Sequence, residues 1–159
     1  SSWAIDVLEE NNYVYDSSVV PAKTSMYGLP NAEHKPYRIT SKSIEKNDSS
    51  GKIIEFPLLT TTFLGKRIPA AGGFYLRSLP TKVIKNALQN YQNRNIPGSF
   101  YIHSWELTPE FMPKLDLPFK DKFVTYHNLD KAYSRMSELL KIFEFTSFSR
   151  YIKENKMIN

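Results

Sequence analysis

The chain has 159 residues, a formal net charge of +5, 41% hydrophobic and 23% charged residues, and no cysteine. This composition is typical of one globular domain, and it excludes a disordered chain, a disulfide framework and a cysteine-based zinc site. The basic residues are scattered and no nucleic-acid-binding motif is present, so we expect a solvated basic surface and no nucleic-acid partner. No apolar run reaches the roughly 18 residues of a transmembrane segment.

The first predicted element is a short helix that begins at Trp3 and ends at Asn11, because Asn tolerates the left-handed backbone that terminates many helices. A strand rich in Tyr and Val follows over residues 13–20. The apolar face of the helix comprises Trp3, Ala4, Val7 and Leu8.

The middle of the chain is predicted to be extended. Residues 21–50 form a long polar connection, and its last part, residues 46–51, has the composition of a hairpin loop. A second strand covers residues 53–59, and residues 60–64 continue it up to a turn at Gly65.

The second half alternates loops, helices and strands. Residues 69–75 form a loop, and Pro80 opens a helix because proline suits the first helical position. A short buried-type strand covers residues 99–104, and a helix spans residues 129–143 with Asn128 as its N-cap. Helices that alternate with strands predict one α/β domain over residues 1–159, with parallel strand pairing.

The segment 101–106 contains the clearest candidate for catalysis. Its apolar strand ends at His103, and Trp105 and Glu106 follow directly. In parallel sheets the carboxyl ends of strands face the active site, where a histidine can act as a general acid or base near neutral pH. From the spacing alone, a histidine that is hydrogen-bonded at a strand end for purely structural reasons is an equally good interpretation.

Several short stretches resemble the C-terminal half of the polysaccharide deacetylase family, also called the NodB-homology domain or carbohydrate esterase family 4. They occur in the family's order, cover nearly the whole chain, and are most similar to the branch encoded with bacterial exopolysaccharide and exosortase loci. The stretches are residues 3–8, 15–18 with 27–30, 55–58, 70–75, 101–107 and 128–130.

This resemblance implies that the parent domain hydrolyses N-acetyl groups of hexosamine units in a polysaccharide. The family fold is a distorted (β/α) barrel, and an Asp-His-His triad holds zinc or a similar divalent ion. A late histidine protonates the leaving amine, and His103 matches it. The aspartate that orients this histidine is matched here by Asp16, whose alternative role is a cap on the amides of Ser17 or Ser18.

The resemblance also suggests substrate contacts. The double glycine Gly72-Gly73 would let a loop approach a sugar closely, with Tyr75 and Trp105 as stacking surfaces. The alternative is a tight turn that an aromatic side chain closes. Glu106 would bond a sugar hydroxyl or an inner partner, and a surface ion pair is its alternative role.

The metal-binding motifs of the family are absent from this sequence. The three histidines, His34, His103 and His127, include no pair four residues apart, and no Asp-Asp strand end occurs. We therefore expect residues 1–159 to be the C-terminal portion of a deacetylase domain, with the metal ligands outside this chain and the chain alone inactive. The open half-barrel would associate with an N-terminal piece or with a second copy. A bacterial cytoplasmic or cell-envelope location is left open.

Two other interpretations of the sequence stand beside this one. The chain could be a non-catalytic carbohydrate-binding or structural module that uses the same aromatic surface. It could also be an unrelated α/β protein whose motif matches are chance.

Overall fold

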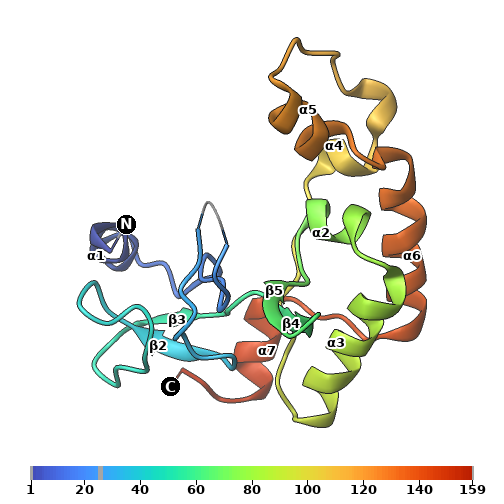
Figure 1. The fold of residues 1–159 in the computed structure, drawn as a ribbon. Helices are drawn as coiled ribbons and strands as arrows, with labels where there is room; N and C mark the ends of the chain where they lie inside the picture. Colours follow the sequence, from blue (N-terminus) through green and yellow to red (C-terminus); the bar gives the residue numbers. More distant parts are fainter. Residues whose placement is uncertain (1, 25–26, 159) are drawn as a thin grey trace.

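A computed structural model describes residues 2–24 and 27–158. Its elements form a mixed α/β structure with two small open sheets (Figure 1). The three-stranded sheet lies on one side of the molecule, and the long helices α3 (Thr81–Asn93) and α6 (Ala132–Ile142) lie on the other. No barrel is closed by the described strands, so the expected barrel fragment stays a prediction.

The larger sheet is built around its central strand, β3 (Ile53–Glu55). Strand β1 (Tyr15–Asp16) pairs with β3 in parallel, and β2 (Tyr37–Ile39) pairs with it in antiparallel orientation. Successive side chains of a strand point to opposite faces of its sheet. Ile53 accordingly packs in the cluster beside α1 (Trp3–Glu10), whereas Ile54 packs in the cluster beside α7 (Phe148–Glu154).

A β-hairpin connects this sheet to the helical side of the molecule. Strands β4 (Thr60–Phe63) and β5 (Lys66–Pro69) pair in antiparallel orientation, and β4 contacts α3. Helix α2 (Gly73–Ser78) packs on α6. Between these elements lies the main hydrophobic core, made of Val20, Ala22, Leu58, Leu59, Ala70, Ala71, Leu76, Ile84, Ala87, Leu88, Tyr91 and Leu139.

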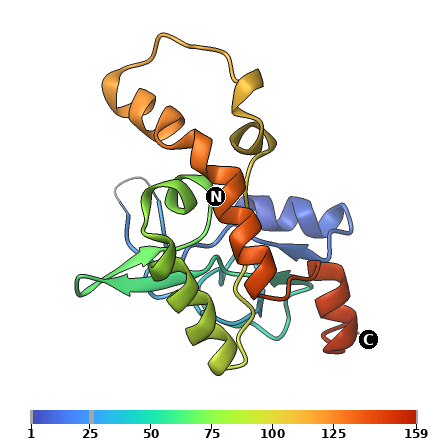
Figure 2. The same ribbon diagram turned by 90° about the vertical axis from the view of Figure 1, so that its right-hand side faces the viewer.

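A projecting arm extends from the helical side over residues 108–126 (Figures 1 and 2). Helix α4 (Ser104–Leu107) leads into it, and the 3₁₀ turn η1 (Pro109–Phe111) and α5 (Phe119–Tyr126) belong to it. Neither η1 nor α5 contains a buried residue, and the side chains of Phe111 and Phe119 are 81% and 85% exposed. A second 3₁₀ turn, η2 (Leu129–Lys131), returns the chain to α6.

The predicted helices at the start and in the middle of the chain are confirmed. Helix α1 ends at the Asn11 C-cap, and α3 follows Pro80 with a buried apolar stripe. The predicted apolar face of α1 is confirmed at Leu8, which packs on the sheet, and wrong at Trp3 and Val7, which are exposed, because the helix buries Ile5 instead. Ile5 packs against Tyr37 and Ile39 of β2 and Ile53 of β3, and this contact with the sheet decides which face of α1 is buried.

Other boundaries differ from the prediction. Residues 99–104 form no strand: the backbone is extended, Ser99 bridges Leu58, and α4 begins at Ser104. The 69–75 loop prediction was wrong at its end, where Gly73 starts α2. The polar tail after Arg150 is also helical, because Ile152 in α7 is buried against the sheet.

The helix predicted over residues 129–143 exists as η2 followed by α6. Asn128 precedes it, as predicted, but its side chain does not cap the helix. Its amide donates instead to the backbone oxygen of Arg77, at 3.1 Å. Across the described residues, no helix combines the length and apolar character needed to cross a membrane.

Candidate active site

His103 stands at the junction between the extended segment and α4. Its backbone is extended (φ −85°, ψ 148°) and occupies the N-cap position of α4, with a side chain that is 55% exposed. The structure therefore presents His103 to solvent from the start of a short helix, not from the end of a strand.

Glu106, three residues later, is the acidic partner of His103. One carboxylate oxygen, Oε2, accepts hydrogen bonds from the His103 backbone N–H at 3.1 Å and from His103 Nδ1 at 3.0 Å. The carboxylate has a side-chain exposure of only 1%. A carboxylate oxygen can only accept, so Nδ1 of His103 carries the proton and Nε2 is the nitrogen left free for a reacting group.

Arg77 holds the other oxygen of the Glu106 carboxylate. Oε1 lies 3.0 Å from Arg77 Nε and 2.9 Å from Arg77 Nη2, and the guanidinium is as buried as the carboxylate. This side-on pairing uses the planar geometry that guanidinium and carboxylate share. Burial of both charges makes loss of one partner costly, because the other is left without compensation in a dry environment.

The same guanidinium joins the projecting arm to α2. Its Nη1 donates to the backbone oxygen of His127, and its Nη2 donates to that of Val124 at 3.1 Å. Arg77 thus ties together the end of α2, the start of α4 and the end of α5. The unit Arg77–Glu106–His103 is fixed by these contacts, whereas the His103 ring itself is open to solvent.

A cavity of about 340 Å³ opens beside this unit. Aromatic rings form much of its wall: the Trp105 ring stacks on His103 with 5.5 Å between centroids, and Tyr101 meets His103 edge-on at 5.5 Å. Its lining residues are Thr24, Tyr27, Gly73, Phe74, Tyr75, Arg77, Tyr101, His103, Trp105, Glu106, Val124 and Thr125.

Three tyrosines of the cavity form a connected group. Burial and the neighbouring Tyr27 raise the pKa of the Tyr75 hydroxyl, and burial together with Tyr27 and Glu106 raises the pKa of Tyr101. Both hydroxyls therefore stay neutral near pH 7 and serve as hydrogen-bond donors and acceptors.

The two predicted loop glycines are needed because the protein itself fills the space beside them. A Cβ on Gly73 would lie 1.7 Å from Glu106 Oε2, and a Cβ on Gly72 would lie 2.7 Å from the Tyr101 ring. Gly72 also has a φ of +92°, which L side chains rarely adopt. Because neither glycine has a side chain, Gly73 leaves space for the Glu106 carboxylate and Gly72 leaves space for the Tyr101 ring. Gly73 also lines the cavity.

Asp16 lies in a different part of the molecule from His103. It is paired with Glu55 across β1 and β3, its Oδ2 accepts from Ser18 Oγ at 2.6 Å, and it lines a separate hollow beside α1. The structure therefore brings together His103, Trp105, Glu106, Gly73 and Tyr75, and it places Asp16 elsewhere. The acidic partner predicted for His103 is supplied by Glu106.

Glu55 and Arg77 are two buried charged residues that sequence reasoning missed. Glu55 is fully buried, accepts from the Val19 N–H at 2.9 Å through Oε1, and leaves Oε2 without a partner among the described residues. Burial, followed by the nearby Asp16, raises the pKa of Glu55 to about 8. For Glu55 the available sequence signal is a charged residue between two apolar neighbours, Ile54 and Phe56, whereas Arg77 is followed by Ser78 and has no such signal.

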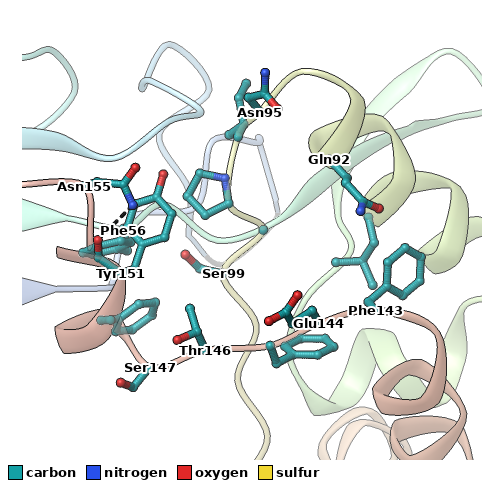
Figure 3. Close-up of a pocket in the computed structure, with 16 residues that line it drawn as sticks. Phe56, Gln92, Asn95, Ser99, Phe143, Glu144, Thr146, Ser147, Tyr151 and Asn155 are labelled. Carbon is teal, nitrogen blue, oxygen red and sulfur yellow. Dashed lines mark hydrogen bonds between the residues drawn. The ribbon is translucent and has the colours of Figure 1, made fainter. Parts of the chain in front are cut away.

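A larger hollow of about 560 Å³ lies apart from this unit (Figure 3). The 95–99 segment, the 143–148 segment and α7 line it, with Phe56, Phe143 and Tyr151 among its walls. It contains one ionisable acid, Glu144, and no histidine or arginine, so acid–base chemistry points to His103 instead.

No group of three or more His, Cys, Asp or Glu side chains within residues 2–24 and 27–158 is arranged to hold a metal ion. The chemistry that the chain offers is proton transfer at His103 Nε2, next to aromatic and hydroxyl surfaces.

In a comparison with known families, residues 17–153 match the family described as "Domain of unknown function (DUF3473)". The match covers most of the chain and spans every residue of the cavity, so the chain belongs to this family. No match was found among the curated proteins or the solved structures.

Proposed function

We propose that this chain is the C-terminal portion of a polysaccharide deacetylase whose complete domain removes N-acetyl groups from hexosamine units of a bacterial polysaccharide. The observation that carries the proposal is the half-exposed His103, oriented by a buried carboxylate and set beside an aromatic cavity. The resemblance of the sequence to that family supports the same reading. Any metal ligands belong to protein outside this chain.

In this proposal His103 is the general acid. A water molecule adds to the carbonyl carbon of the acetamide and gives up a proton, and the C–N bond then breaks as the nitrogen takes a proton from Nε2 of the doubly protonated His103 ring. The products are an amine and acetate, and the proton released by water restores the protonated ring. Glu106 is a positioning residue: by accepting from Nδ1 it turns Nε2 toward the cavity. Arg77 in turn prevents the Glu106 carboxylate from rotating away.

The sugar would be held by the aromatic wall. Trp105, partly buried, stacks on the His103 ring, and the hydroxyls of Tyr75 and Tyr101 supply polar contacts at the same cavity. Aromatic side chains with a few convergent polar groups are typical of small-molecule binding sites. A general acid contributes about 100-fold or more to such a reaction.

The test measures deacetylation of N-acetylglucosamine oligomers by the complete protein in the presence of zinc. We expect His103→Ala to lower kcat by about 100-fold or more with little change in KM. Glu106→Gln should lower kcat and alter the pH profile, because the amide no longer fixes the proton on Nδ1. The exposed pair Lys85–Glu138 provides a matched control, since Glu138→Gln removes an equal charge far from the cavity.

Two outcomes would count against the proposal. Unchanged kcat in His103→Ala would remove the proposed general acid, and rapid turnover by the present chain alone would show that no further half is needed. Glycan binding without catalysis, kept in His103→Ala but lost in Trp105→Ala, would instead favour a non-catalytic carbohydrate-binding module. Thermal unfolding of each variant separates loss of chemistry from loss of fold.

A further inference from the structure

We propose that a second hollow, between the β4–β5 hairpin and α3, binds a small oxyanion: a phosphate or a carboxylate group. The hollow has a volume of about 400 Å³ and shares no lining residue with the cavity beside His103. Its lining consists of His34, Thr60, Thr61, Thr62, Arg67, Asn86, Ala87, Asn90, Tyr91 and Arg94. Two of these residues are arginines, none is acidic, and hydroxyl and amide groups make up most of the rest.

The floor of the hollow is a rigid polar cluster. The Tyr91 hydroxyl lies 3.1 Å from Thr60 Oγ1 and 3.2 Å from His34 Nδ1, and it accepts from the Thr60 backbone N–H at 3.3 Å. Thr60 and Tyr91 are both buried, so these groups are held in place by the main core. His34 therefore presents its ring at a fixed position on the wall of the hollow.

The guanidinium groups of the two arginines, Arg67 and Arg94, have few partners within the described protein. The Arg94 guanidinium makes no hydrogen bond or ion pair with the residues that the structure describes, and within the same residues the Arg67 guanidinium makes a single hydrogen bond, to the Pro30 backbone oxygen at 3.4 Å. The side chains of Asn86 and Asn90 likewise have no hydrogen-bond partner in the described chain. All four side chains are exposed, so their donors face solvent and are open to a ligand that enters the hollow.

The charges around His34 point to the same ligand class. Burial, then Arg67 and then Arg94, lower the pKa of His34, so both guanidinium groups act on one site. Glu33 opposes them more weakly, and Lys46 lies 3.8 Å from the Glu33 carboxylate. A site with surplus positive charge and planar, forked donors suits phosphate or carboxylate oxygens, which accept two parallel hydrogen bonds from one arginine.

The experiment is a titration of the chain, followed by amide NMR shifts, with inorganic phosphate in one arm and glucuronate in the other at constant ionic strength. We expect saturable shifts at the amides of Thr61, Asn90 and Arg94. Arg67→Gln and Arg94→Gln should each weaken binding by about tenfold, as loss of a charge-assisted hydrogen bond does. Arg150→Gln is the matched control, because it removes the same charge from an exposed side chain on α7.

Saturation by both probes, or by one of them, supports the site and tells whether phosphate or carboxylate is its ligand. Shifts that stay linear with both probes would overturn the proposal. Equal weakening by Arg150→Gln would also overturn it, since the effect would then be one of net charge. The result is independent of His103, so its failure leaves the proposed catalytic function untouched.

Discussion

At the residue scale, Glu55 is a fully buried carboxyl group on the central strand of the three-stranded sheet. It lies on β3 between the Val19 N–H and Asp16, and no cation pairs with it in the described chain. Burial penalises its charged form, and the neighbouring Asp16 adds repulsion. The neutral acid is therefore the form that the folded protein prefers.

This preference makes folding stability depend on pH. Because the pKa of Glu55 rises from 4.5 to about 8 on folding, its contribution is fully present below pH 4.5 and is lost as the pH rises to about 8. The free energy of unfolding should fall by roughly 1.4 kcal/mol per pH unit across that window, from this group alone. Glu55→Gln removes the ionisation and should make the protein more stable than wild type at about pH 9, with little difference at about pH 4.

Urea unfolding of both proteins at several pH values measures the difference. Asp48→Asn is the control, because Asp48 is only partly buried and hydrogen bonds donated by Ser50 and Thr40 lower its pKa, the opposite direction to Glu55. Parallel pH curves for wild type and Glu55→Gln would contradict the assignment.

At the element scale, α6 has one buried face and one exposed face, and two adjacent leucines lie on opposite faces. Leu139 is fully buried in the main core, whereas Leu140 is 53% exposed. The opposite end of the helix is attached to α2 through Arg135, whose Nη1 lies 2.8 Å from the backbone oxygens of Leu76 and Arg77. Helix α6 thus contributes Leu139 to the main core and also holds the end of α2, which carries Arg77 of the candidate site.

We expect Leu139→Ala to lower the free energy of unfolding by roughly 2–5 kcal/mol, because it leaves a cavity in a packed core. Leu140→Ala, the matched control one residue away, should change it by less than about 0.5 kcal/mol. Chemical denaturation followed by circular dichroism compares the two. Equal effects would show that the packing of α6 differs from the one described.

At the scale of the whole molecule, an exposed apolar arm extends from a folded body. Phe111, Leu115 and Phe119 are all substantially exposed on it, and Phe123 is 47% exposed. The edge strands β1 and β2 are only two and three residues long, which limits pairing through the sheet edge. Association, expected from the sequence, would therefore use the arm rather than the sheet.

Light scattering at increasing protein concentration tests this expectation. We expect the purified chain to exceed the mass of a monomer, and the double variant Phe111→Ser, Phe119→Ser to shift it back toward a monomer, because apolar surface is removed. Tyr133→Ser, an exposed aromatic on α6, is the control. A wild-type chain that stays monomeric at all concentrations would contradict the prediction.

Local patterns predicted the parts of the fold that local interactions decide. Helical spacing and Pro80 located α3, and apolar spacing located α6, because a continuous stripe such as Ile84, Ala87 and Leu88 requires one helical face. The short strand β2, the turn into α4 and the helix α7 were missed. Their stability comes from contacts with distant residues, such as Ile152 with Ile54, that no local pattern contains.

The candidate site divides in the same way. The sequence by itself determined that His103, Trp105 and Glu106 lie next to one another in a segment that follows an apolar run, and that two glycines precede Tyr75. Only the tertiary structure decided that Glu106 turns inward to pair with Arg77, that Gly73 leaves room for it, and that Asp16 lies elsewhere. A buried charge is stable only where distant segments supply its partner, and that partner is fixed by packing rather than by spacing in the chain.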